Sequence, residues 1–269
     1  LTLDAYTGMR NHWGFWAGGE FSPDNTDLFG TRWLPDWSGR GPLLVNPRNI
    51  MGWVGFHSDG TKKLSMEMNL ATSGDRVGAR GRSANMSLAW VQSSRLGHHL
   101  SLSYSWHKDD AQWLMNEISD TGIGGVSYVF AGLDRRVWDA TLRSRLLFNR
   151  DQSLELYVQP FLAVGDYSGA KELVHADSYE FTPYTAGGFE VTDRDFNMGA
   201  VDLNMVYRWE YRPGSTLFLV WSHSRFSTER LGDYDGDRSL FRNDYHTAPI
   251  FDVEPENRFM AKLSYWFPV

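Results

Sequence analysis

Apolar and polar residues alternate along much of this chain with a period of two. From 201 to 211 every odd position is Val, Leu, Met, Tyr or Trp, whereas the even positions include Asp, Asn, Arg and Glu. The segments 98–107 and 63–71 repeat the alternation. Because successive side chains of a strand point to opposite faces, this period predicts β-strands, and helical spacing cannot produce it.

The same pattern predicts eleven strands over the whole chain. They lie at 1–9, 12–21, 48–57, 63–71, 84–92, 98–107, 136–148, 154–164, 201–211, 215–225 and 257–267. Pro160 stands inside one of them and cannot donate a ladder hydrogen bond, so we expect a bulge or a local bend there.

The connections between these strands alternate between short and long. Tight turns such as Asp59-Gly60-Thr61 and Arg212-Pro213-Gly214 join some neighbours. Long polar segments are expected at 22–47, 73–83, 108–126, 166–196 and 227–256. Outer-membrane barrels have short periplasmic turns and long extracellular loops, and their strands are of about this length. A soluble β-sandwich also has alternating strands and is the alternative, although its strands are usually shorter.

Composition favours the membrane interpretation. Aromatic residues make up 15% of the chain, and Trp and Tyr favour a membrane interface. The net charge of −7 argues against non-specific nucleic-acid binding, and the absence of cysteine excludes disulfides and thiolate sites. No stretch approaches the roughly 20 apolar residues of a spanning helix. We therefore expect an all-β fold: one antiparallel transmembrane β-barrel domain over 1–269, integral to the outer membrane of a Gram-negative-type bacterium.

The strand count bears on whether this barrel is complete. The count of eleven strands is odd, whereas bacterial barrels have an even number, so either a strand near 1–21 or 108–135 is miscounted, for a total of about 11 to 12, or an upstream partner strand is missing. The start at Leu1-Thr2-Leu3 has no initiator Met and no signal peptide. We expect a processed or truncated chain, part of a larger barrel, that lacks upstream strands and an N-terminal soluble domain.

Several motifs carry a family resemblance. They are Tyr-Val-Gln-Pro-Phe at 157–161, Gly-Asp-Tyr-Ser-Gly at 165–169, Arg-Trp-Glu-Tyr-Arg-Pro-Gly-Ser at 208–215 and Ser-Tyr-Trp-Phe-Pro at 264–268. Together they resemble the C-terminal barrel region of bacterial proteins of unknown function whose N-terminus carries a domain similar to carbohydrate-binding module family nine. The resemblance spans about 12–269. It implies a sugar-binding-like domain upstream and assigns no catalytic residue.

Nine charged residues lie on the polar faces of the predicted strands and would line the lumen of a barrel. They are Glu67, Asp139, Arg143, Arg145, Glu155, Asp202, Arg208, Glu210 and Lys262. Mixed charges of this kind could shape a selective pore. The alternative is that they form ion pairs across the lumen or only solvate a wide interior.

The loop at 233–237 is the one candidate metal site. Asp233, Asp235 and Asp237 alternate as at the start of a calcium loop, but Arg238 stands where such a loop has glycine. The alternative is a solvated acidic loop. We expect no other cofactor.

The function expected first is a porin-like channel for small solutes or saccharides. Loop residues Trp33, Trp37, Trp113 and Tyr184 could stack on sugar rings or anchor the loops. The alternative is a structural or plugged barrel that anchors a surface or periplasmic partner domain or subunit. The expected partners are outer-membrane lipid, lipopolysaccharide and the barrel-assembly machinery, with no nucleic acid. His223 and His175 form no recognisable catalytic motif with their neighbours, so no enzyme is expected.

Overall fold

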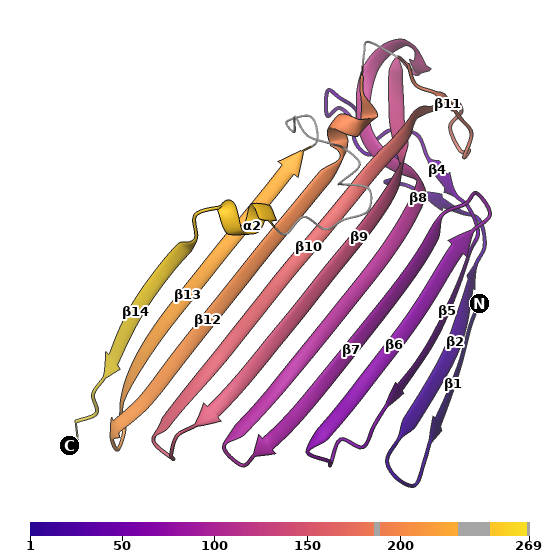
Figure 1. The fold of residues 1–269 in the computed structure, drawn as a ribbon. Helices are drawn as coiled ribbons and strands as arrows, with labels where there is room; N and C mark the ends of the chain where they lie inside the picture. The colour runs from indigo at the N-terminus through magenta and orange to yellow at the C-terminus, as the bar shows by residue number, and fades with distance from the viewer. Residues whose placement is uncertain (186–188, 231–247, 268–269) are drawn as a thin grey trace.

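The computed structural model describes residues 1–185, 189–230 and 248–267. They form an all-β protein dominated by one antiparallel sheet, in which each strand pairs with its neighbour along the chain in the order β1-β2-β5-β6-β7-β8-β9-β10-β12-β13-β14 (Figure 1). The short β11 pairs with β10, and β3 and β4 form a separate hairpin. Within the described residues, β1 and β14 are the two edges of the sheet.

The elements have the following bounds. They are β1 (Thr2–Gly8), β2 (Gly14–Ser22), β3 (Asn25–Asp27), β4 (Leu44–Asn46), β5 (Asn49–His57), β6 (Leu64–Asp75), β7 (Arg80–Ser93), β8 (Leu96–Ile123), β9 (Val126–Leu147), β10 (Gln152–Leu173), β11 (Phe181–Pro183), the 3-10 helix η2 (Val191–Arg194), β12 (Phe196–Arg212), β13 (Ser215–Arg230), α2 (Ala248–Asp252) and β14 (Glu256–Ser264). Each of the eleven predicted strands corresponds to one strand of the main sheet, which confirms the all-β antiparallel prediction.

Two predicted loops are wrong. The segment 108–126 is mostly strand, because β8 runs on to Ile123 and turns back at Gly124 and Gly125, whose φ angles are 62° and 85°. Register shifts interrupt the β8–β9 pairing there three times, and each shift resets the alternation that sequence analysis depends on. The segment 73–83 is a tight hairpin, in which Asp75 accepts three backbone N–H groups.

Pro160 causes no bulge. Pairing between β9 and β10 is broken beside it, but Val158 lies opposite Leu142 and Phe161 lies opposite Asp139, so the register is unchanged. On the other side Pro160 keeps its place opposite Val201 of β12. The proline therefore interrupts the ladder without shifting it.

The register sorts the side chains onto one apolar and one polar face. Val158 lies opposite both Leu142 and Leu203 on the apolar face. On the polar face Ser87 lies opposite Glu67 of the preceding strand. Because directly opposed residues of antiparallel strands share a face, the apolar face can be followed from β1 to β14, with His223 and Arg225 of β13 as polar members opposite Leu203 and Val201.

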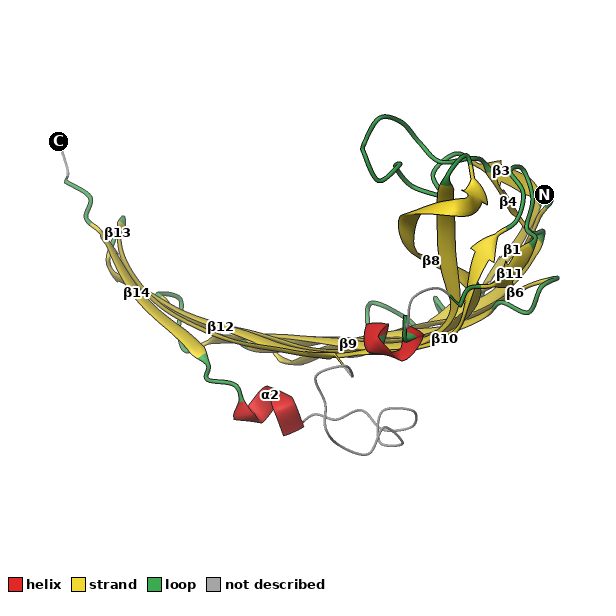
Figure 2. Cartoon of the chain, turned by 90° about the horizontal axis from the view of Figure 1, so that it is seen from above, coloured by secondary structure: helices red, strands yellow, loops and turns green. Residues whose placement is uncertain are grey.

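The sheet is strongly curved (Figure 2), and its apolar face is the convex one, because α2 lies outside the curve and packs on that face. Helix α2 lies outside the curve, where its Ile250 side chain packs on Gly199 beside Leu162 of the apolar face. No other described element covers this face. Val54 is 53% exposed and Phe259 is 78% exposed, although both are apolar. The second sheet among the described residues is the two-stranded β3–β4 hairpin, which lies on the concave side and does not cover this face as the second sheet of a sandwich would (Figure 2).

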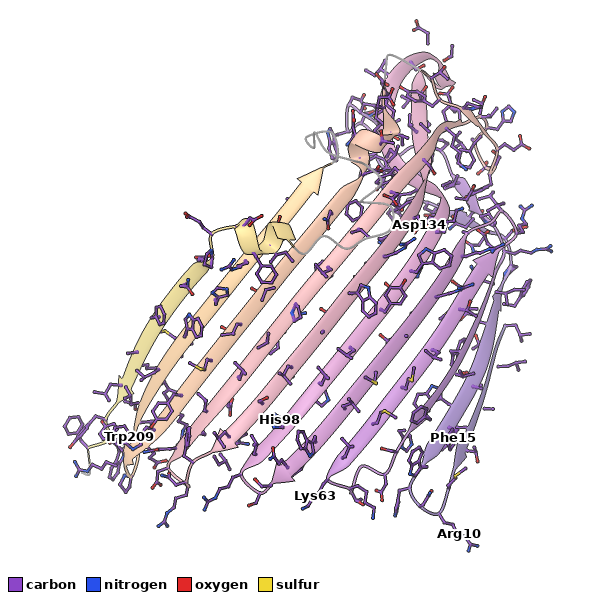
Figure 3. All side chains as sticks on the ribbon, in the orientation of Figure 1. Arg10, Phe15, Lys63, His98, Asp134 and Trp209 are labelled. Carbon is purple, nitrogen blue, oxygen red and sulfur yellow. The ribbon has the colours of Figure 1, made fainter. Side chains whose placement is uncertain are left out.

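Buried side chains gather instead in a cap at one end of the sheet. The cap comprises β3, β4 and β11 with the extensions of β8, β9 and β10 beyond the sheet, and it leans over the concave side (Figure 2). Its core contains Leu44, Tyr128, Phe130 and Leu173. The opposite end of the sheet carries the tight turns, where Arg10 and Lys63 lie (Figure 3).

Candidate functional site

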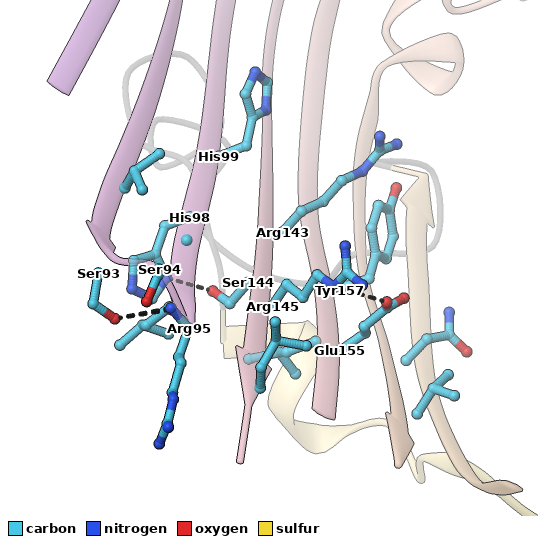
Figure 4. Close-up of a pocket in the computed structure, with 17 residues that line it drawn as sticks. Ser93, Ser94, Arg95, His98, His99, Arg143, Ser144, Arg145, Glu155 and Tyr157 are labelled. Atoms are coloured by element: carbon cyan, nitrogen blue, oxygen red, sulfur yellow. Dashed lines mark hydrogen bonds and ion pairs between the residues drawn. The ribbon is translucent and has the colours of Figure 1, made fainter. Parts of the chain in front are cut away.

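The concave face contains a recess of about 710 Å³ close to the tight turns. Strands β8, β9 and β10 supply His99, Arg143, Arg145, Glu155 and Tyr157 to its wall, as Figure 4 shows. These residues alternate along their strands with the apolar residues of the convex face, so the pleat alone directs them inward. These five residues bring two guanidinium groups, a carboxylate, an imidazole and a phenol to the recess, whose lining also includes Arg95 and His98.

A chain of polar contacts holds one side of the recess. The Arg143 guanidinium lies 5.4 Å from the centre of the Tyr157 ring. The Tyr157 hydroxyl donates to Gln159 Oε1 at 2.6 Å, and Gln159 Nε2 donates to Asp139 Oδ2 at 2.8 Å. The cation–π contact with Tyr157 thus positions the Arg143 guanidinium, while the N–H donors of Arg143 stay available to a solute.

The second arginine of the recess pairs with a carboxylate. Arg145 and Glu155 are directly opposed, with Nε to Oε1 at 3.6 Å, and their side chains are 68% and 59% exposed. An exposed pair of this kind adds little stability. Both groups remain solvated, and together with Arg143 they can bind an anion or a hydroxyl-rich solute through hydrogen bonds.

All nine predicted lumen residues lie on the concave polar face according to the register. The structure brings Arg143, Arg145 and Glu155 into the recess. Arg208 and Glu210 form a separate pair, with a 2.8 Å hydrogen bond. The remaining members, Glu67, Asp139, Asp202 and Lys262, are spread over β6, β9, β12 and β14. Sequence analysis omitted His99 and Tyr157, although their even or odd positions already placed them on this face.

A second hollow of about 620 Å³ lies on the same face near the turn between β5 and β6. Its wall includes Tyr6, His57 and Glu67. The Tyr6 hydroxyl and His57 Nε2 are 3.3 Å apart. The polar lining therefore continues along the tight-turn end of the concave face, beyond the recess.

Two of the four loop aromatics anchor the cap. Trp113 donates its indole N–H to Asn116 Oδ1 at 2.9 Å. The Tyr184 hydroxyl donates to Glu117, and burial together with this carboxylate raises the pKa of Tyr184 to about 12. In contrast, Trp33 and Trp37 are 47% and 76% exposed, with ring centres 6.5 Å apart.

The predicted calcium ligands Asp233, Asp235 and Asp237 lie outside the described residues. Within the described residues, no group of three or more His, Cys, Asp or Glu side chains could hold a metal ion. None of the described helices has the length and apolar character needed to span a membrane.

Comparison with known proteins gives one match. The family model of a domain of unknown function, DUF5916, matches residues 1–268. No curated protein and no solved structure matches the chain. Since the match covers almost every residue, including all strands of the main sheet, the chain belongs to the DUF5916 family of unknown function.

Proposed function

We propose that this sheet forms most of the wall of an outer-membrane β-barrel that acts as a channel for small solutes, including saccharides. The observation that carries the proposal is the division of a single curved sheet into a charged concave face and an apolar convex face, of which α2 alone among the described elements covers a part. An apolar face as large as the convex one would strongly promote aggregation if it were exposed to water. Lipid on the convex side and water on the concave side satisfy both faces.

The apolar band has the height that a membrane requires. On β8 it extends from Leu96 to Trp106. Ten steps of about 3.3 Å give about 33 Å along the strand, or about 25 Å along the barrel axis at a tilt of about 40°. Aromatic residues border it at both ends, with Trp90 and Trp209 near the tight turns and Trp138 near the cap. This arrangement supports a lipid-facing band between two interfacial girdles.

Closing the sheet sets a condition on the complete barrel. The edge strands β1 and β14 run in the same direction, because ten successive antiparallel pairings separate them. Closure with antiparallel pairs alone therefore needs an odd number of further strands between β14 and β1. Added to the eleven strands of the main path, an odd number of further strands gives a total of twelve, fourteen or a higher even number, as found in bacterial barrels.

The recess supports solute binding within the channel. Arg143 and Arg145 offer fixed N–H donors, and Tyr157 offers a ring face and a hydroxyl, which is a combination that suits saccharide hydroxyls or anionic groups. The resemblance to proteins with a sugar-binding-like N-terminal domain favours saccharides among the possible solutes. Lipopolysaccharide and the barrel-assembly machinery are the partners expected for such a protein.

A plugged barrel that anchors a partner domain or subunit is the second candidate. The cap favours it, because a packed loop domain leans over the concave side at the end opposite the turns (Figure 2). If the cap closes the lumen, the protein would hold a partner at the membrane rather than pass solutes.

Single-channel recording separates the two candidates. The protein, purified from the membrane of its own cells, would be reconstituted in a planar bilayer in salt. Stable conductance steps are expected for the channel, and persistent silence from folded protein would favour the plugged barrel. In a conducting protein, Arg143→Glu should move the reversal potential toward cation selectivity, whereas Arg10→Glu at a turn outside the recess should have little effect.

A further inference from the structure

On β7, β8 and β9 the convex face carries a group of four basic side chains at the cap end, above the apolar band. We call this group the basic patch, and it consists of Arg80, Arg82, Lys108 and Arg136. They come from three adjacent strands, β7, β8 and β9, and form two rows one above the other. Arg80, Arg82 and Lys108 are exposed, and Arg136 is partly exposed.

The upper row sets like charges against each other. Arg80 lies directly opposite Lys108 in the β7–β8 ladder. Like charges in directly opposed positions destabilise a sheet. Within the described residues, neither side chain, nor that of Arg82, has a carboxylate within ion-pair distance. Repulsion between these positive charges therefore destabilises the basic patch, and a bound anion would relieve this repulsion.

The carboxylates near the patch are already engaged. Asp134, opposite Lys108, pairs with Arg136 at 3.6 Å and accepts the indole N–H of Trp106 at 2.9 Å. Asp166, opposite Asp134 on β10, also has an interaction partner. Four cations thus face two carboxylates, an excess of two positive charges, and Arg80, Arg82 and Lys108 can bind a ligand from outside the described residues.

The aromatic residues of this region fix its depth in a membrane. The Arg82 guanidinium lies 5.3 Å from the centre of the Trp106 ring. One step below, Tyr104 and Trp138 pack with ring centres 4.5 Å apart. Trp and Tyr favour the headgroup level of a bilayer, so the basic side chains just above them lie where lipid phosphates are found.

We infer that the basic patch binds the phosphate groups of lipids in the membrane leaflet on the cap side. In an outer membrane these are phosphates of lipopolysaccharide. The inference rests on the proposed membrane-spanning function and adds a lipid site and an orientation to it. Arginine suits phosphate because its planar fork donates two parallel hydrogen bonds, and Arg80 with Arg82 presents two such forks on one face.

The test compares lipid A with and without its phosphates. The protein in dodecyl maltoside would be titrated with bisphosphorylated lipid A, with dephosphorylated lipid A and with inorganic phosphate, and binding would be followed by native mass spectrometry. The triple variant Arg80→Ser, Arg82→Ser, Lys108→Ser should bind bisphosphorylated lipid A about 100-fold more weakly. The matched variant Arg10→Ser, Lys63→Ser, Arg150→Ser removes the same charge at the tight-turn end and should bind nearly as the parent does.

A single substitution distinguishes a loss of lipid binding from a loss of folding. Lys108→Ser removes the opposition to Arg80, so without lipid it should fold at least as stably as the parent, while lipid A binding falls about fivefold. Equal losses in both triple variants, or equal binding of dephosphorylated lipid A, would overturn the inference. Full competition by inorganic phosphate at similar concentration would instead identify a free-phosphate site. A folded barrel migrates differently on a gel before and after heating. If the parent in detergent shows no such difference, it has not folded as a barrel, and the proposed barrel itself is contradicted.

Discussion

Leu203 and Asn204 are consecutive residues of β12 that serve opposite faces of the sheet. Leu203 lies opposite Val158 on the convex face, whereas Asn204 accepts a hydrogen bond from the Ser222 hydroxyl at 2.6 Å on the concave face. If the convex face meets lipid, Leu203→Arg should cost roughly 2 to 4 kcal/mol of folding free energy. Asn204→Arg should have little effect, because the new side chain points into water.

The comparison uses urea unfolding of the protein in lipid vesicles, followed by tryptophan fluorescence. The two variants carry the same new charge at adjacent positions, so each is the control for the other. Equal losses of stability would contradict the assignment of faces, and with it the proposed contact with lipid.

The faces of the main strands were predictable because alternation there is uninterrupted. A period of two assigns every residue of 201–211 to a face without knowledge of any partner strand, and register then only aligns faces that already exist. This is why the polar positions Arg143 and Glu155 could be placed in the concave lining, although their meeting in one recess depends on the β9–β10 register.

The cap could not be predicted in the same way. Register shifts between Asp109 and Gln112 and between Trp113 and Met115 change which positions share a face, and they leave no period in the sequence. The core of the cap also joins Leu44 to Leu173, which are far apart in the chain. Packing between segments distant in the chain determines the structure of the cap, and the local alternation of apolar and polar residues carries no information about that packing.

Strands β2 and β5 contain a reciprocal pair of tryptophan and glycine contacts that gives a second prediction. Trp16 lies opposite Gly55, and Gly18 lies opposite Trp53. A Cβ atom at Gly55 would stand 2.3 Å from the Trp16 ring, so Gly55→Ala must displace that ring and should cost about 1 to 3 kcal/mol.

Gly52 is the matched control on the same strand. Of the atoms in the described residues, a Cβ atom there would meet only the Gly18 carbonyl oxygen, at 3.8 Å, so Gly52→Ala should be neutral or stabilising. Urea unfolding of both variants in vesicles measures the difference. A Gly55→Ala protein as stable as the Gly52→Ala protein would show that Trp16 can move away freely.

The raised pKa of Tyr184 gives a prediction at alkaline pH. The unfolded side chain ionises near its ordinary value of 10.0, whereas in the cap its pKa is about 12 because of burial and the neighbouring Glu117 carboxylate. The neutral form is therefore favoured by folding, and its contribution to stability is complete below pH 10 and is lost as the pH rises through 12.

Phenolate absorbance at 295 nm tests this value directly. The titration curve of the parent minus that of Tyr184→Phe should have its midpoint near pH 12 while the cap stays folded. Tyr265→Phe removes a tyrosine outside the cap and serves as the control for loss of one phenol. A difference curve for Tyr184 with a midpoint near pH 10 would contradict its contact with Glu117.

Asn116 ties the segment around Trp33 to the cap, and its removal gives the last prediction. Its side-chain amide donates to the carbonyl oxygens of Thr31 and Trp33, each at 2.7 Å, while its Oδ1 accepts the Trp113 indole N–H. Asn116→Asp keeps the acceptor and the shape but loses both donors, and it places a negative charge beside two carbonyl oxygens. We expect this variant to lose about 1 to 3 kcal/mol of local stability.

Limited proteolysis reports this loss, because the exposed segment at 33–40 should be cut faster once it is released from β8. Gln112→Glu is the matched control, since it makes the same amide-to-acid change on the same strand at a residue whose amide, among the described residues, bonds only the neighbouring Trp113 carbonyl, at 3.4 Å. Cleavage at 33–40 should rise in Asn116→Asp alone. If the cap closes the lumen, the same variant should also raise the conductance of the reconstituted protein, whereas faster cleavage without any change in conductance would separate the anchoring of this segment from the gating of a pore.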